Sequence, residues 1–311
     1  MDFPKMDFPE SRITSTNCFR DTQLIQEIHQ MGSASAYLPK VEKTYGKIIF
    51  PPGEQYPYTY GSIALSMDGK MAYPDNTDGD MLVHSNTLDP DGALADFFVL
   101  NFLRAYSDAV MVGTNSMKAE ANEWITIYDE ELCQERLSHM PEKDPQPFTI
   151  VSSKDGTDIP FDHILFNQDR LPVLVFTSPV GYENIQKAQP GRFFRMTDIT
   201  RETIRESTGK NPVVVTGQGD QTDLIRFMAL MKGAGVDHML IESPMLMWLL
   251  MKEKLLNEFF MTYSSIFVGG HMSPGFFAPF TFEEHPQSRM MWVNHHQNNF
   301  LYVRQTIEAA K

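Results

Sequence analysis

The stretch at residues 94–120, LADFFVLNFLRAYSDAVMVGTNSMKAE, constrains the fold of this chain more than any other. In its first half, apolar residues recur at the spacing of one helix face, and they are Ala95, Phe98, Val99, Phe102 and Leu103. A short apolar run at residues 109–112 has the length of a strand that is buried on both faces. Gly113 then ends the run. This order predicts a helix, a buried strand and a glycine turn.

Small hydrogen-bonding residues come directly after this predicted strand. Thr114, Asn115 and Ser116 follow Gly113, at the carboxyl end of a strand, where open α/β sheets bind their ligands. Backbone N–H groups of a glycine turn that opens a helix suit a phosphate. An ordinary strand-to-helix connection is the alternative interpretation of the same residues.

The alternation of short apolar runs with amphipathic segments continues over residues 59–270. It predicts one α/β domain with a mostly parallel central sheet and helices on both faces. We assign residues 56–311 to this domain and residues 1–55 to an N-terminal extension, with a helical pattern at residues 22–31. We expect the extension to pack on the domain or on a second subunit, and a separate functional unit is the alternative. The charged, proline-containing segment at residues 123–146 predicts a surface excursion.

Composition excludes several classes of protein. No apolar run approaches the roughly 20 residues of a membrane span, and the first ten residues lack the apolar core of a signal peptide. Cys18 and Cys133 are too far apart for a disulfide framework or a metal-ligand spacing. We therefore expect a cytoplasmic protein without membrane association. The formal net charge of −14 argues against a nucleic-acid partner but not against a nucleotide.

Three motifs resemble those of one enzyme family. LRAYSDAVMVGTNSMKAE at residues 103–120, SMDGK at residues 66–70 and LIESP at residues 240–244 resemble, in this order, the reductase domain of riboflavin biosynthesis (the RibD C-terminal domain). That domain belongs to the dihydrofolate reductase-like superfamily. The resemblance runs from about residue 58 to residue 270. It implies a three-layer α/β domain that reduces a pyrimidine- or pterin-type substrate with NADPH, as the 5-amino-6-(5-phosphoribosylamino)uracil reductases do.

The resemblance also implies roles for four charged residues. In the family, the turn that holds Asp68 and Lys70 lies over the nicotinamide and the substrate, although Asp-Gly also favours a plain hairpin turn. Asp96 opens a predicted helix where dihydrofolate reductases carry their substrate-binding carboxylate, and its alternative role is to complement the helix dipole. Glu120 is a candidate ligand of the ring or the ribityl group. The candidate catalytic residues are Asp68, Lys70, Asp96 and Glu120.

Candidate cofactor-binding residues lie at the ends of predicted strands. Ser152, Ser153 and Lys154 follow the apolar run at residues 148–151 and suit the 2′-phosphate of NADPH, with a solvated turn as the alternative. Gly217-Gln218-Gly219 lacks the third glycine of a dinucleotide fingerprint. The full set is Gly113, Thr114, Asn115, Ser116, Ser152, Ser153, Lys154, Thr177, Gly217, Gly219, Asp220, Glu242 and Ser243. His295 and His296 would point to opposite faces of a strand, so we expect no metal site.

Three departures from the family affect ligand contacts, and one of them is Glu120-Ala121-Asn122 in place of the family's Asp-Asn-Pro. Ser243-Pro244 replaces a Gly-Gly pair in the pyrophosphate slot, and Ser62 stands where riboflavin reductases often carry a substrate-binding lysine. A non-catalytic nucleotide-binding or scaffold protein is therefore the alternative function. The resemblance implies a homodimer, because riboflavin-type reductases generally dimerise through their late strands. The predicted strand at residues 257–270 has an apolar face with Phe259, Met261 and Tyr263 that suits such an interface. Residues 1–55 could instead cover that face in a monomer.

Overall fold

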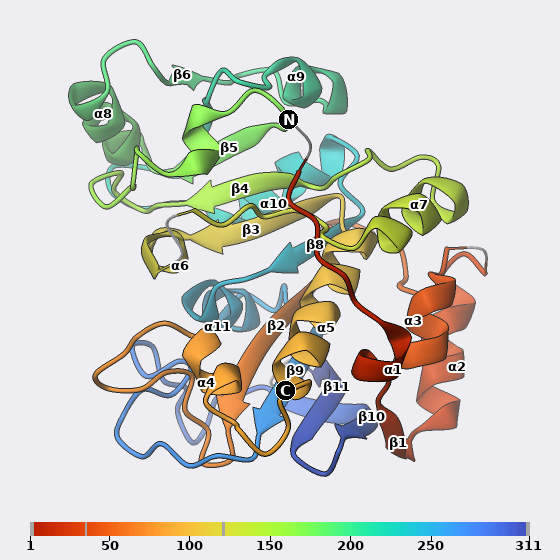
Figure 1. Ribbon diagram of the computed structural model, residues 1–311. Coiled ribbons are helices and arrows are strands. Elements are labelled where there is room, and N and C mark those ends of the chain that lie inside the picture. Colours follow the sequence, from red (N-terminus) through yellow and green to blue (C-terminus); the bar gives the residue numbers. More distant parts are fainter. Residues whose placement is uncertain (1–2, 35, 120–121, 309–311) are drawn as a thin grey trace.

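The sheet of this protein spans the whole molecule (Figure 1). A computed structural model describes residues 3–34, 36–119 and 122–308. The 11-stranded sheet has the order β1-β10-β11-β9-β2-β8-β3-β4-β5-β7-β6. The strands are β1 Thr16–Arg20, β2 Tyr58–Ser66, β3 Ala109–Gly113, β4 Phe148–Ser152, β5 Val173–Thr177, β6 Phe194–Arg195, β7 Pro212–Val215, β8 His238–Ile241, β9 Glu258–Ser264, β10 Gln287–His296 and β11 Phe300–Glu308.

Helices connect most of the parallel strands. They are α1 Glu10–Ile13, α2 Thr22–Met31, α3 Pro39–Thr44, α4 Asp80–His84, α5 Gly92–Tyr106, α6 Thr114–Ala119, α7 Glu130–His139, α8 Pro179–Ala188, α9 Arg201–Glu206, α10 Leu224–Gly233 and α11 Pro244–Lys252, with a 3-10 turn η1 at Ile164–Asn167. Among the described residues, no helix is long and apolar enough to cross a membrane.

The sheet is parallel over most of its width. From β9 through β2, β8, β3, β4, β5 and β7 to β6, neighbouring strands pair in parallel. The remaining strands β11, β10 and β1 continue from β9 in antiparallel order. The predicted α/β class with a mostly parallel central sheet is therefore confirmed.

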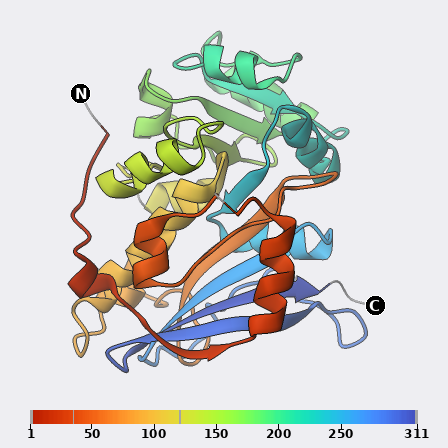
Figure 2. The same cartoon turned by 90° about the vertical axis from the view of Figure 1, so that its right-hand side faces the viewer.

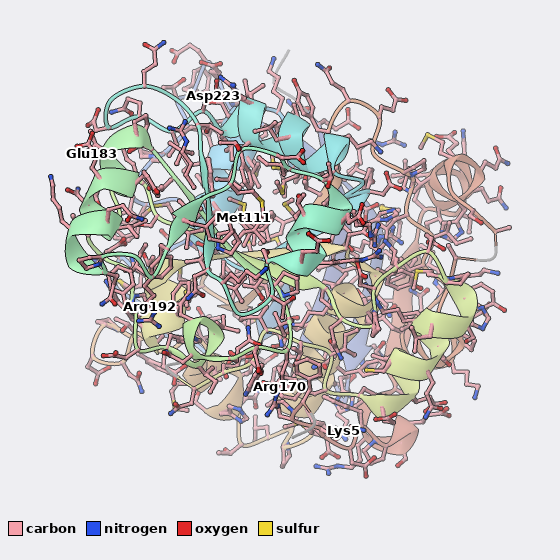
Figure 3. All side chains as sticks on the ribbon, turned by 90° about the horizontal axis from the view of Figure 1, so that it is seen from above. Lys5, Met111, Arg170, Glu183, Arg192 and Asp223 are labelled. Atoms are coloured by element: carbon pink, nitrogen blue, oxygen red, sulfur yellow. The ribbon has the colours of Figure 1, made fainter. Side chains whose placement is uncertain are left out.

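Alternate residues of the central strands pack against helices on opposite faces of the sheet. Val110 and Val112 of β3 belong to one buried cluster with Phe102 of α5, whereas Met111 belongs to the other with Phe227 of α10. In Figure 1, α5 lies in front of the sheet and α10 behind it. Seen from above, Met111 lies near the middle of the molecule (Figure 3). The continuous apolar run at residues 109–112 is thus explained, because both of its faces are covered.

The N-terminal residues contribute to the same core. In Figure 2, this red segment runs down one side of the molecule before β1 joins the edge of the sheet. Phe8, Leu38 and Val41 are buried in the cluster that α5 faces. The ring of Phe50 stacks on Tyr60 of β2 at a centroid distance of 4.3 Å. The helix predicted at residues 22–31 forms as α2.

Two segments differ from their sequence-based expectations. The predicted surface excursion at residues 123–146 contains α7, which starts at the side-chain cap Asp129. Its Arg136 is fully buried and donates to the carbonyl oxygens of Ala105 and Ser107 at 2.6 and 2.8 Å. The strand predicted at residues 257–270 ends at Ser264, and a long loop follows it.

Candidate functional site

A cavity of about 1240 Å³ lies where β3, β4 and β8 end. Parallel strands of an open sheet place their carboxyl ends along one edge, which is where such folds bind ligands. One part of the cavity is lined by hydroxyl groups and lysines, and the other by carboxylates. The residues of the first part are Thr114, Asn115, Ser116, Lys118, Ser152, Ser153, Lys154 and Ser243, together with one carboxylate, Asp158. The carboxylates of the second part are Asp80, Asp96, Glu123 and Glu242.

The hydroxyl-rich part contains the first turn of α11. Ser243 is the N-cap of this helix, and its side chain does not accept a hydrogen bond from the helix. Pro244 occupies the first helical position, which suits a residue without an N–H group. The N–H groups of Met245 and Leu246 therefore lack a side-chain cap beside the cavity, which both residues line. A Cβ atom at Gly113 would lie 2.8 Å from Ser243 Oγ, so glycine allows β3 and α11 to approach closely.

Arg104 anchors the carboxylate-lined part. Its guanidinium makes two hydrogen bonds to the Glu242 carboxylate, both at 2.8 Å, and one to Glu123 at 3.1 Å. It also donates to the carbonyl oxygen of Thr126 at 3.1 Å. Burial raises the pKa of Glu123, Arg104 opposes this rise, and Glu242 adds to it. One buried cation is thus shared by two carboxylates that face the cavity.

Asp96 has an unusual protonation equilibrium. It lies in the second turn of α5 and lines the cavity. Burial raises its pKa to about 7, a hydrogen bond with Thr262 opposes the rise, and the charge of Asp80 adds to it. Partial desolvation by the surrounding protein and the charge of Asp78 also raise the pKa of Asp80, although its side chain remains exposed. Near neutral pH, Asp96 can therefore both accept hydrogen bonds and donate a proton.

Several predicted site residues lie away from the cavity lining. Asp68 accepts hydrogen bonds from Ser66 Oγ at 2.6 Å and from the N–H groups of Val268 and Gly269 at 3.0 and 2.7 Å. These bonds lower its pKa to about 2. Asp68 thereby links its own turn to the loop after β9, and the two loops lie side by side at the lower left of Figure 1. Lys70 belongs to the same turn.

The other predicted residues outside the lining belong to nearby turns. Thr177 is buried and donates to the carbonyl oxygen of Lys154 at 3.2 Å. Gly217 has a φ of 87° and closes a turn in which a Cβ would lie 2.0 Å from the Gln221 carbonyl oxygen. Gly219 and Asp220 belong to the same turn and do not line the cavity. Their neighbour Gln221 does line it. Glu120 lies outside the described residues.

Several polar residues of the site were not predicted from the sequence. Among them are Asp80, Arg104, Glu123 and Asp158, which line the cavity, and Thr262, which hydrogen-bonds Asp96. Arg104 lies inside the LRA motif, and this position could have indicated that it belongs to the site. Glu123 and Asp158 lie in polar segments whose composition is typical of surface loops. The sequence therefore did not indicate that either residue lines a cavity.

In the described part of the chain, the site lacks a metal-binding cluster and is separate from a second cavity. Over residues 3–34, 36–119 and 122–308, no group of three or more His, Cys, Asp or Glu side chains could hold a metal ion. A second cavity of about 460 Å³ lies between the N-terminal segment and α7. It is lined by Lys5 and Arg170, which lie on the same side of the molecule in Figure 3, and by none of the residues of the larger cavity.

Comparisons with known proteins agree on one family. The family model of the RibD C-terminal domain matches residues 57–301. The 2,5-diamino-6-ribosylamino-4(3H)-pyrimidinone 5′-phosphate reductase of Archaeoglobus fulgidus is 25% identical over 219 residues, which are 70% of this chain and 84% of that protein.

Solved structures share the fold. A pyrimidine reductase-like protein from Corynebacterium diphtheriae matches with a TM-score of 0.57 and 16% identity, over 81% of this chain and 92% of that chain. The riboflavin biosynthesis reductase of Saccharomyces cerevisiae matches with a TM-score of 0.51 and 12% identity, over 92% of this chain and 98% of that chain.

Proposed function

Because the chain belongs to the family of the RibD C-terminal domain, we propose that it is an NADPH-dependent reductase of riboflavin biosynthesis that acts on a ribosylamino-pyrimidine phosphate. The observation that carries this function is a large cavity with a hydroxyl-rich part and a carboxylate-lined part. The first part suits a dinucleotide and the second suits an amino-substituted ring. The substrate named for the Archaeoglobus relative is of this class.

The hydroxyl-rich part has the groups that a dinucleotide needs. Uncapped N–H groups at the start of α11 and the hydroxyl of Ser116 suit a pyrophosphate. Lys154 follows β4 at the same edge and supplies a positive charge for a further phosphate. Ser243 and Pro244 narrow this slot, and Ser243 packs closely against Gly113. When bound, the nicotinamide supplies the hydride.

The carboxylate-lined part suits the substrate ring. An ionised carboxylate accepts two N–H bonds from an amino-pyrimidine, and Asp96 and Glu123 both line this part. Reduction of a carbon–nitrogen double bond consumes one hydride and one proton. Asp96 can supply that proton, because its pKa of about 7 leaves it partly protonated at neutral pH. Arg104 fixes the orientation of Glu242 between the two parts of the cavity.

A homodimer and a cytoplasmic location complete the proposal. Met261 and Tyr263 of β9 are half-buried, and they lie opposite the half-buried Val303 and Leu301 of β11. This row of apolar side chains suits contact with a second copy. A monomer mass by light scattering at micromolar concentration would contradict the dimer. The two cysteines are free thiols, which supports a cytoplasmic location.

The activity is testable directly. Purified protein is mixed with NADPH and 2,5-diamino-6-ribosylamino-4(3H)-pyrimidinone 5′-phosphate or its deaminated uracil analogue, and the absorbance of reduced nicotinamide is followed. We expect oxidation of the cofactor with at least one of these substrates. The named relatives are reductases, which favours catalysis over a non-catalytic binding protein. Tight NADPH binding without turnover on either compound would instead support the binding protein.

A further inference from the structure

Asp158 bridges the ends of two neighbouring strands inside the hydroxyl-rich part of the cavity. One of its carboxylate oxygens accepts a hydrogen bond from Thr114 Oγ1, directly after β3. The other accepts from Ser153 Oγ, directly after β4, at 2.5 Å. All three residues line the cavity. The single hydroxyl protons of Thr114 and Ser153 are therefore both directed at Asp158 rather than at a ligand.

The turn that carries Asp158 is held firmly. Ser153 Oγ accepts a hydrogen bond from the N–H of Gly156 at 3.1 Å. Gly156 has a φ of 68°, and a Cβ there would lie 2.4 Å from the carbonyl oxygen of Gly181 in α8. Thr114 and Ser153 are 5% and 3% exposed. The carboxylate is thus fixed at the strand ends by packing as well as by hydrogen bonds.

We propose that Asp158 sets the nucleotide preference of this site, so that the protein binds NADH alongside NADPH. This role rests on the proposed function and takes the adenosine ribose to lie at the ends of β3 and β4, beside Lys154. A carboxylate accepts a hydrogen bond from a ribose 2′-hydroxyl, as acidic residues do in other dinucleotide sites. A 2′-phosphate is anionic and is repelled by a carboxylate at contact distance. Lys154 attracts that phosphate and Asp158 opposes it, which limits the preference for NADPH.

Calorimetric titration with NADPH and NADH tests this role by binding alone. The variant Asp158→Asn keeps the size of the side chain and removes its charge. We expect the ratio of the NADH Kd to the NADPH Kd to rise by about tenfold in this variant. The matched control is Asp155→Asn. Asp155 lies on the same turn, is exposed, accepts from Thr157 at 3.0 and 2.6 Å, and does not line the cavity.

The possible results separate this role from the proposed function. An unchanged ratio in Asp158→Asn, or an equal change in Asp155→Asn, would overturn the role of Asp158 while leaving the reductase intact. Absence of binding by either dinucleotide to the wild type would overturn both.

A second measurement does not depend on the variant folding. Adenosine 2′,5′-bisphosphate and AMP compete for the wild-type protein against a bound dinucleotide. We expect their Kd values to agree within about tenfold. Much tighter binding of the bisphosphate would overturn the role of Asp158.

Discussion

Arg104 and Glu242 face each other in a two-bonded ion pair, with Nε to Oε1 and Nη2 to Oε2 both at 2.8 Å. The side chain of Arg104 is 1% exposed. Burial alone would lower the pKa of Arg104, but the charge and hydrogen bonds of Glu242 raise it. A planar guanidinium holds a carboxylate in one orientation. The pair therefore joins the end of α5 to the residue that precedes the first turn of α11.

We predict that Arg104→Lys lowers kcat/KM by about a hundredfold, because one ammonium group cannot hold both carboxylate oxygens. Steady-state kinetics with NADPH at saturation provide the measurement. The control is Arg12→Lys, since Arg12 pairs with Asp91 at the surface and is expected to change the rate by less than about twofold. Full activity in Arg104→Lys would show that the orientation of Glu242 does not matter for the reaction.

Asp96 makes both stability and activity depend on pH. Its folded pKa of about 7 lies above the ordinary value of 3.8, so the native state binds the proton more tightly than the unfolded chain. The free energy of unfolding should therefore fall as pH rises from about 4 to about 7. In Asp96→Asn this fall should be absent, which makes the variant more stable at pH 8 by on the order of 3 kcal/mol. Urea unfolding at several pH values measures the difference.

The same substitution should reduce turnover. Asn cannot donate the proton, so we expect kcat to fall by about a hundredfold. The wild-type rate should also decline as pH rises through about 7, and Asp96→Asn should lose this decline. Asp75→Asn serves as the control, because Asp75 is exposed and does not line the cavity. A wild-type rate that stays constant from pH 6 to 8 would rule out Asp96 as the proton donor.

Asp68 is expected to act through loop order. Its hydrogen bonds to Val268 and Gly269 link two loops that place Met71 and Met272 at the cavity. Asp68→Ala should therefore raise the substrate KM several-fold and leave kcat within about threefold. Amide hydrogen exchange of residues 266–272 should become faster in the variant. A loss of kcat at unchanged exchange would point instead to direct contact with the substrate.

The central strands could be predicted from their apolar runs, because helices cover both faces of the sheet there. The run at residues 109–112 became β3, and the run at residues 148–151 became β4. The helix α7 was missed because one of its two buried residues, Leu132 and Arg136, is an arginine. Arg136 is stabilised by carbonyl oxygens of residues 105, 107 and 144, and such acceptors belong to every residue and leave no trace in a sequence.

The site was predictable where it depends on strand ends and unpredictable where it depends on distant pairs. Ser152 ends β4 and Ser243 lies two residues after β8, and both line the cavity. Arg104 and Glu242 are 138 residues apart, so their pairing required the fold. The glycines at 217 and 219 serve a tight turn, with Gln218 and Gln221 bridged across it. The Gly-x-Gly spacing is therefore explained by the geometry of this turn.

The buried pair Asp108–Lys143 should control acid stability. The Lys143 ammonium lies 2.8 Å from the Asp108 carboxylate, and each side chain is 3% exposed. Burial alone would raise the pKa of Asp108, but Lys143 and His238 lower it to about 2. The pair thus stabilises the fold above pH 4, and this contribution is lost as pH falls from about 4 to about 2.

Asp108→Asn leaves the buried Lys143 without its carboxylate partner, so we expect it to cost about 3 kcal/mol of unfolding free energy at pH 7. The control Asp237→Asn breaks a pair with Lys232 in which Asp237 is 46% exposed, and should cost less than about 1 kcal/mol. In urea unfolding, the gap between the wild type and Asp108→Asn should narrow below pH 4, and a constant gap would contradict this assignment.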